Sequence, residues 1–113
     1  MMAASSPEKR QERYMRDDLP MRLGNLASDL LRLSQWVWQP EHDPSAVVLM
    51  DQIAAMVEWN GESATEELVD VQREILRWRN VWPLEPARSL LAFRARKLSD
   101  RVLEMSGLLE ARS

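Results

Sequence analysis

Cysteine is absent from this chain of 113 residues, and histidine occurs once, at His42. Without thiolates the chain forms no disulfide and no sulfur-based zinc site, and a cysteine-free protein suits a reducing compartment, so we expect a cytoplasmic protein. His42 has no Glu-x-x-His neighbour of the kind that builds metal sites in helical bundles, and no serine elbow that would suggest a nucleophile. We therefore predict no metal, no cofactor and no enzymatic activity.

Long apolar runs and alternating apolar and polar stretches are also lacking. A membrane-spanning helix needs about 20 apolar residues, and the polar start of the chain lacks the apolar core of a secretory signal, so we expect no membrane association. Strands leave an alternating pattern, and none competes here with helical spacing. The formal net charge is −3, whereas general nucleic-acid binding usually brings a strong basic excess, so nucleic acid is an unlikely partner.

What the chain does contain is a series of apolar stripes with steps of three and four residues, the spacing of one helical face. Prolines and a Ser-x-x-Glu capping box at 63–66 separate these stripes, as expected at helix ends. Asp43 is expected to cap the second helix, and Asn60–Gly61 to end it. Short connections force consecutive helices to turn back, which predicts an all-α, antiparallel up-down-up-down four-helix bundle over 19–113. Residues 1–18 form a polar N-terminal segment, disordered or short-helical. The four helices are expected at about 19–38, 44–60, 63–82 and 86–110.

The predicted helix 44–60 is apolar around most of its circumference. One bundle needs only a stripe of about 100° on each helix, so the surplus must be covered by a second copy, a partner helix or the N-terminal segment. We expect homodimerisation or binding of another protein through this surface. The leading hypothesis is a non-enzymatic protein–protein interaction or regulatory module. The candidate interface residues are Val47, Val48, Ala55 and Met56.

Four of the five tryptophans are expected at one end of the bundle, where the first and third predicted helices both stop. Trp36 and Trp38 flank the apolar stripe on opposite sides, so at least one must face out. Tryptophan combines a large apolar area with one N–H donor and is a common binding anchor. The alternative hypothesis is therefore a small-ligand site in a tryptophan-rich end. Its residues would be Trp36, Trp38, Trp82, His42 and Arg88.

Three bases, Arg94, Lys97 and Arg101, recur at helical steps in the last predicted helix. This stripe is a weaker candidate for an acidic partner or a phosphate, and it can equally pair with acids of neighbouring helices. The acids near 66–74 have the spacing of a solvated face that alternates with arginines, so we predict no metal there.

The stretches EELVDVQREILRWRNVWP and LSDRVLEMSGLL resemble short helical proteins of cyanobacteria that carry no assigned function. The resemblance covers about residues 19–110 and rests on composition and phrase. It implies a small cytoplasmic helical protein, and it transfers neither an activity nor a site residue.

Overall fold

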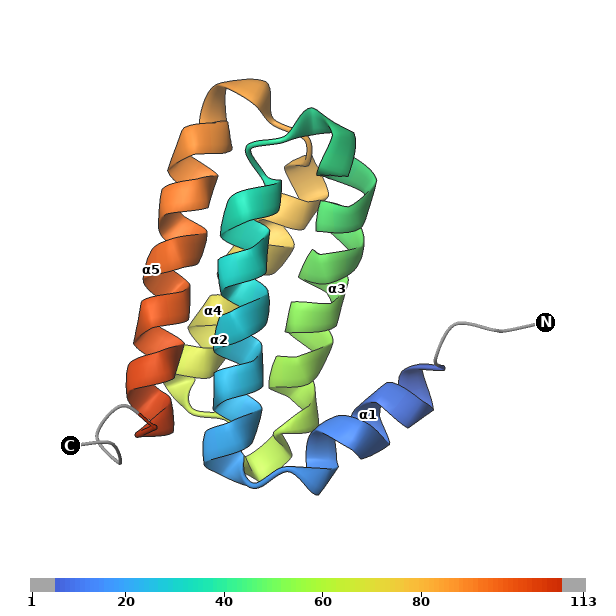
Figure 1. Ribbon diagram of the computed structural model, residues 1–113, viewed down its shortest axis with the longest axis vertical. Coiled ribbons are helices and arrows are strands. Elements are labelled where there is room, and N and C mark those ends of the chain that lie inside the picture. Colours follow the sequence, from blue (N-terminus) through green and yellow to red (C-terminus); the bar gives the residue numbers. More distant parts are fainter. Residues whose placement is uncertain (1–5, 109–113) are drawn as a thin grey trace.

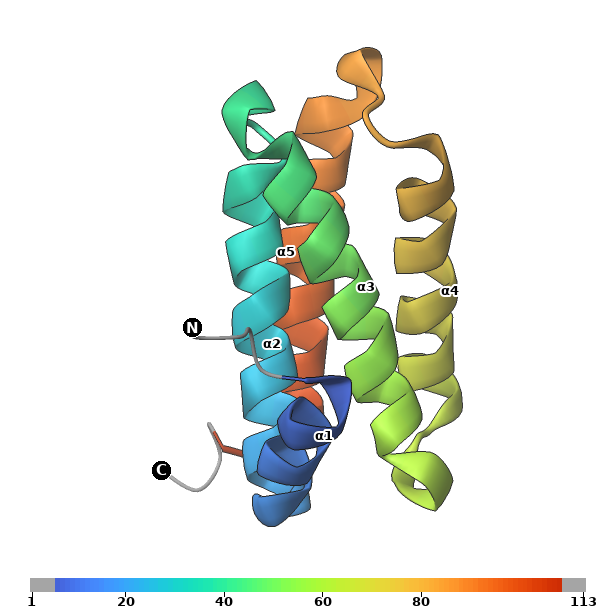
Figure 2. The same cartoon turned by 90° about the vertical axis from the view of Figure 1, so that its right-hand side faces the viewer.

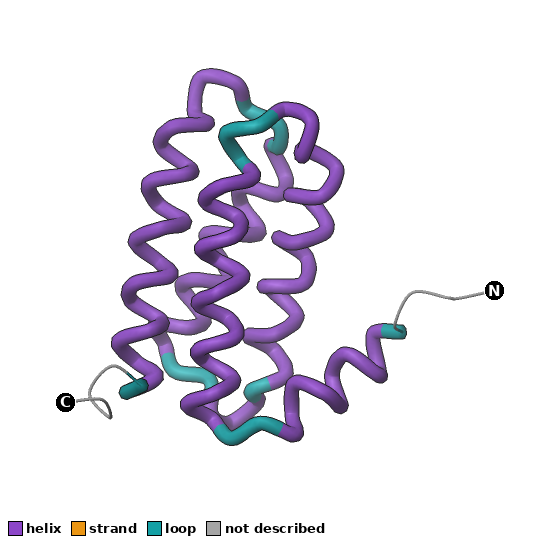
Figure 3. Tube along the Cα trace, in the orientation of Figure 1, coloured by secondary structure: helices purple, strands orange, loops and turns teal. Residues whose placement is uncertain are grey.

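The computed structural model describes residues 6–108, so the predicted features at 1–5 and 109–113 lie outside the described residues. Within this range the protein has five α-helices and no strand (Figures 1 and 3). The short 3₁₀ helices Pro40–His42, Gly61–Ser63 and Glu85–Ala87 lie in three of the connections. The α-helices are α1 (Pro7–Arg16), α2 (Leu19–Trp36), α3 (Asp43–Trp59), α4 (Glu66–Val81) and α5 (Arg88–Ser106).

The four long helices lie side by side and alternate in direction, while α1 leaves them at an angle at one end (Figures 1 and 2). The all-helical class is confirmed. The described residues form five α-helices and not four, because the polar N-terminal segment takes the short-helical form of the two alternatives and docks on α3. Ser6 caps this helix: its hydroxyl accepts a hydrogen bond of 3.2 Å from the Lys9 amide, as N-cap serines do.

Side-chain caps start two other helices. Asp18 accepts from the Met21 amide at 3.1 Å and begins α2, and Thr65 accepts from the Leu68 amide at 3.3 Å and begins α4. The capping box expected from Ser63 is therefore wrong by two residues, because Ser63 belongs to a 3₁₀ turn that precedes the helix. Asp43 also differs from its expected capping role: it is the first residue of α3, and its carboxylate binds an arginine.

Small residues bring α2 and α5 close together. Ala27 and Ala95 are buried in the shared interface, and the Ser99 hydroxyl donates a 2.7 Å hydrogen bond to the Ala27 carbonyl oxygen. At Gly24, a Cβ built on the backbone would lie 2.9 Å from the end of the Leu108 side chain.

One hydrophobic core runs between the long helices, and the predicted apolar stripes supply it. Leucines of α2, α3 and α4 lie in this core with leucines, alanines and one valine of α5, and Trp78 belongs to it at 8% exposure. Among the helices of the described residues, none is long and apolar enough to cross a membrane. The largest fully buried side chains are Leu26, Leu30, Leu33, Val37, Leu49, Met50, Ile53, Val57, Leu68, Ile75 and Val102.

Candidate functional site

Arg88 cross-links the tryptophan-rich end. As the first residue of α5, it lies inside the molecule with 8% of its side chain exposed. Its Nη atoms donate to both oxygens of Asp43 at 2.9 Å, and one of them also donates to the Val37 carbonyl oxygen at 3.0 Å. Its Nε and Nη2 atoms donate to Glu85 at 2.9 and 2.6 Å. A guanidinium has five N–H donors, and these five hydrogen bonds use all of them.

The charges around Arg88 stabilise one another. Hydrogen bonds from its guanidinium hold the pKa of Asp43 below its ordinary value, and they do the same for the pKa of Glu85. The same bonds raise the pKa of Arg88. Asp43 and Arg88 each open an α-helix directly after a 3₁₀ turn, so the pair joins equivalent positions in the two helical hairpins. Arg88 thus has no free donor for a ligand carboxylate or phosphate.

The tryptophans at this end have different roles. Trp38 faces out, with 56% of its surface exposed. Trp36 is half-buried and stacks on His42, with 5.6 Å between the ring centroids. The Arg32 guanidinium lies over the same Trp36 ring, 5.9 Å from its centroid. His42 therefore lies against Trp36, the more buried of the two tryptophans.

Trp82 is half-buried and lies under Arg88, whose guanidinium carbon is 5.2 Å from the ring centroid. Its indole Nε1 is buried without a hydrogen-bond partner in the described residues. A groove of about 350 Å³ lies between α2 and α3 and is lined by Trp36, Arg32 and Val48. Of the five residues proposed for a ligand site, only Trp36 lines this groove. The contacts at this end join Trp36 to His42 and Trp82 to Arg88.

The four residues predicted as an interface on α3 differ in how far they are exposed. Val48 is exposed at 57%, Val47 and Ala55 are half-buried, and Met56 is buried at 8%. Met56 is covered because Tyr14 of α1 packs against the end of α3, with its ring 5.7 Å from that of Trp59. The N-terminal segment is thus one cover for the apolar surplus of this helix, and Val48 is the exposed apolar residue that remains.

A polar network that the sequence did not reveal fastens α1. Tyr14 is 6% exposed, and its hydroxyl accepts a 3.0 Å hydrogen bond from Asn60 Nδ2. The same Asn60 nitrogen donates to the Met56 carbonyl oxygen at 3.1 Å. The Asn60 side-chain oxygen, Oδ1, accepts a hydrogen bond of 3.4 Å from Arg22. Burial raises the pKa of the Tyr14 phenol. The one available signal was that Tyr14 is the single aromatic residue of a polar segment.

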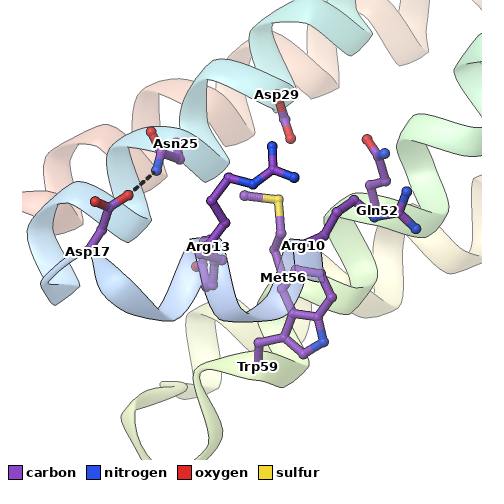
Figure 4. A pocket seen from close by; sticks show the side chains of 9 residues that line it. Arg10, Arg13, Asp17, Asn25, Asp29, Gln52, Met56 and Trp59 are labelled. Carbon is purple, nitrogen blue, oxygen red and sulfur yellow. Dashed lines mark hydrogen bonds between the residues drawn. The ribbon is translucent and has the colours of Figure 1, made fainter. Parts of the chain in front are cut away.

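Docking of α1 forms a small open cavity of about 220 Å³ between α1, α2 and α3 (Figure 4). Met56 and Trp59 form its apolar side. Figure 4 shows the Arg13 guanidinium pointing toward Asp29, and Arg10 reaching toward Gln52. Burial raises the pKa of the Asp29 carboxyl, although Arg32 lies 3.6 Å away on the same helix. The cavity is smaller than the roughly 300 to 1,000 Å³ typical of ligand pockets.

The basic stripe of α5 pairs mainly within the molecule. Arg94 binds Glu74 through two hydrogen bonds of 2.9 and 2.7 Å, and Arg101 binds Glu67 at 3.1 Å. Lys97 instead lies over Phe93, with its Nζ 5.4 Å from the ring centroid. Two of the three bases proposed for an anionic partner are therefore used by acids of α4, which agrees with the internal pairing left open by the sequence.

These ion pairs cross a groove of about 570 Å³ between α4 and α5. Phe93 lines the groove at the end nearer the tryptophans, where three more large apolar side chains are exposed. Their exposures are 55% for Val81, 42% for Leu84 and 59% for Leu90, with 57% for Phe93 itself. These four residues, which we call the apolar corner, come from the end of α4, the α4–α5 connection and the start of α5.

Comparison with known proteins adds no assignment. No family model, no curated protein and no solved structure matches the chain. Across residues 6–108, no group of three or more histidine, aspartate or glutamate side chains is placed to hold a metal ion. Function must therefore be inferred from the surfaces and contacts described above.

Proposed function

We propose that this protein is a non-enzymatic interaction or regulatory module, built on a four-helix bundle of α2 to α5 with α1 as an appended helix, and that it forms a homodimer. The observation that carries the proposal is the apolar corner, where four large apolar side chains from adjacent segments are each more than 40% exposed. Large apolar side chains exposed at one end of a helical protein are typical of protein interfaces.

The charged groups support the same class of function. Arg88, Asp43 and Glu85 satisfy one another, and the long arginines of α5 bind acids of α4. Catalytic acids and bases usually lie in clefts and face a substrate position, whereas these groups stabilise helix connections. A cysteine-free chain also suits the cytoplasm, which remains the proposed compartment.

The apolar corner is a better interface candidate than the α3 surface expected from the sequence. On α3, Val48 is exposed while Met56 is covered by α1. At the corner, Leu90 and Phe93 lie about one helical turn apart near the start of α5, and Val81 is the last residue of α4. Buried aromatic anchors contribute most to interfaces, and we therefore expect Phe93 to carry the largest share of the dimer's binding energy.

The test is the oligomeric state of matched variants. Sedimentation from about 1 to about 100 µM should show a wild-type dimer, and Phe93→Glu should raise its Kd at least about tenfold, equivalent to about 1.4 kcal/mol. The variant should keep its fold, because Phe93 is largely exposed and a glutamate there can pair with Lys97 one turn later. Circular dichroism checks that fold.

Val48→Glu is the matched control, since Val48 is equally exposed on a different helix. Its dimer should match wild type. If Val48→Glu lost the dimer while Phe93→Glu kept it, the interface would lie on α3 and not at the apolar corner. A wild-type chain that stays monomeric at about 100 µM would refute homodimerisation.

A further inference from the structure

The two walls of the α4–α5 groove carry opposite charge. The α4 wall presents Glu67, Asp70 and Glu74 and no base. The α5 wall presents Arg94, Lys97 and Arg101, together with two acids, Asp100 and Glu104, toward the end of the groove far from the apolar corner. The separation of charge is therefore clearest in the half of the groove beside that corner.

The ion pairs across the groove align the two helices. Arg94 meets Glu74 at 2.7 Å, and Arg101 meets Glu67 at 3.1 Å. Asp70 lies between the two acids and Lys97 between the two bases, so these two residues occupy the same level along the groove. Within the described residues they do not bind each other: Lys97 covers Phe93, and Asp70 lies 3.7 Å from Arg73 of its own helix. The centre of the groove thus holds one acid and one base that can take further partners.

We propose that a second copy of this chain docks on the groove and the apolar corner, with the two-fold axis parallel to the long helices. This inference rests on the homodimer proposed above and specifies its orientation. A two-fold axis in this direction preserves the level of each residue and places α4 of one copy against α5 of the other. Asp70 then faces Lys97 of the second copy, and the two apolar corners meet at the same end.

Charge decides between this orientation and the other face-to-face arrangement. With the axis along the helices, Glu74 and Arg94 of both copies alternate in sign around a square, so each charge has opposite neighbours and the existing pairs stay intact. With the axis across the helices, α4 faces α4 and α5 faces α5, which opposes acid to acid and base to base. Complementary potentials favour the first arrangement and disfavour the second.

Site-directed crosslinking can identify the orientation, because the wild-type chain has no cysteine. The single-cysteine variants Asp70→Cys and Lys97→Cys are treated with a short bismaleimide, each alone and as an equimolar mixture. In the proposed dimer the mixture should give at least about threefold more crosslinked product than either variant alone. Ser28→Cys, at an exposed position of α2, is the matched control and should give no product above background.

Salt dependence gives an independent measurement on the unmodified chain. Raising the salt concentration from about 50 to about 500 mM should weaken the dimer about tenfold, because screening removes the attraction between opposite walls. Crosslinking of Asp70→Cys mainly to itself, or a dimer that tightens with salt, would overturn the orientation while leaving the homodimer intact. A wild-type chain that is monomeric at low salt would instead overturn the proposed function, and the orientation with it.

Discussion

Replacing Tyr14 with alanine should detach α1 from the rest of the protein. Tyr14 is the one residue of α1 in the hydrophobic core, and it joins the core through Trp59 and Asn60. An aromatic side chain buries roughly 150 to 250 Å², and at about 25 cal/mol per Å² its loss removes about 4 to 6 kcal/mol of gross stabilisation. The remaining residues of α1 are mostly exposed and cannot replace it.

The substitution should act locally because α1 joins α2 through only Asp17 and Asp18. Once α1 has undocked, the loss of its remaining contacts no longer lowers the stability of the long helices. Their free energy of unfolding should therefore fall by about 2 kcal/mol or less. Tyr14→Phe should cost about 1 kcal/mol, since the buried Asn60 amide keeps its bond to the Met56 carbonyl oxygen.

Hydrogen exchange measured by mass spectrometry is the direct assay. In Tyr14→Ala, amides of α1 should exchange at near-unfolded rates while those of α2 and α5 stay protected, and Trp59 fluorescence should report a more polar setting. Glu12→Ala, an exposed change on the same helix, should leave both signals as in wild type. Protection of α1 that survives Tyr14→Ala, or equal loss of protection in all five helices, would refute local docking through Tyr14.

Three further predictions concern Arg88, Asp43, and the two glycines Gly24 and Gly107. Arg88→Met should lower the Tm by about 10 °C in calorimetry, because Asp43 loses its partner, and Arg88→Lys should recover only part of this, since an ammonium has three donors instead of five. The pKa of Asp43 is lowered by folding, so its contribution to stability is complete above the ordinary aspartate pKa of about 3.9 and is lost as the pH falls through the folded value. In urea titrations, the free energy of unfolding of Asp43→Asn should therefore fall less steeply at acid pH than that of the wild type. An unchanged acid dependence would contradict the ion pair. Gly107→Ala should lower the free energy of unfolding in urea by about 1 kcal/mol, because Gly107 has a φ of 73°. Gly24→Ala should be neutral or slightly stabilising, because alanine has the higher helix propensity and its methyl group meets only the end of the flexible Leu108 side chain. Equal effects at the two glycines would contradict this assignment.

The helices could be predicted from the sequence because apolar spacing and capping residues act over only a few positions. The stripe from Leu19 to Val37 predicted α2, and Asn60–Gly61 marked the end of α3, where Gly61 has a φ of 54°. The outward position of one tryptophan also followed from the pattern, since Trp36 and Trp38 cannot share one helical face. The exposed one is Trp38.

Pairings between distant residues could not be predicted in the same way. Asn60 was interpreted as a helix stop, but its side chain also holds Tyr14, 46 residues away. Asp43 was interpreted as a cap, but it binds Arg88, 45 residues away. Each side chain has several chemically suitable partners in the sequence, and only the arrangement of the helices decides which one lies within hydrogen-bond distance.

For the candidate surfaces too, the sequence predicted properties of single helices but not contacts between helices. The sequence correctly marked helix α3 as apolar on several sides, because that property depends only on which residues the helix contains. It could not say that α1 covers Met56, or that Arg94 and Arg101 are occupied by acids of α4. It also did not predict that Val81, Leu84, Leu90 and Phe93 would all be exposed at the apolar corner.

By itself, then, the sequence determined the helical class, the approximate extent of the long helices and the apolar face of each one. These follow from interactions between residues three or four positions apart, which the backbone geometry of any helix enforces. Tertiary structure alone decided that α1 docks, that Arg88 is saturated, and that opposite charges line the α4–α5 groove. Those outcomes depend on how helices pack and on which side chains compete for the same partner, and such competition is resolved in space rather than along the chain.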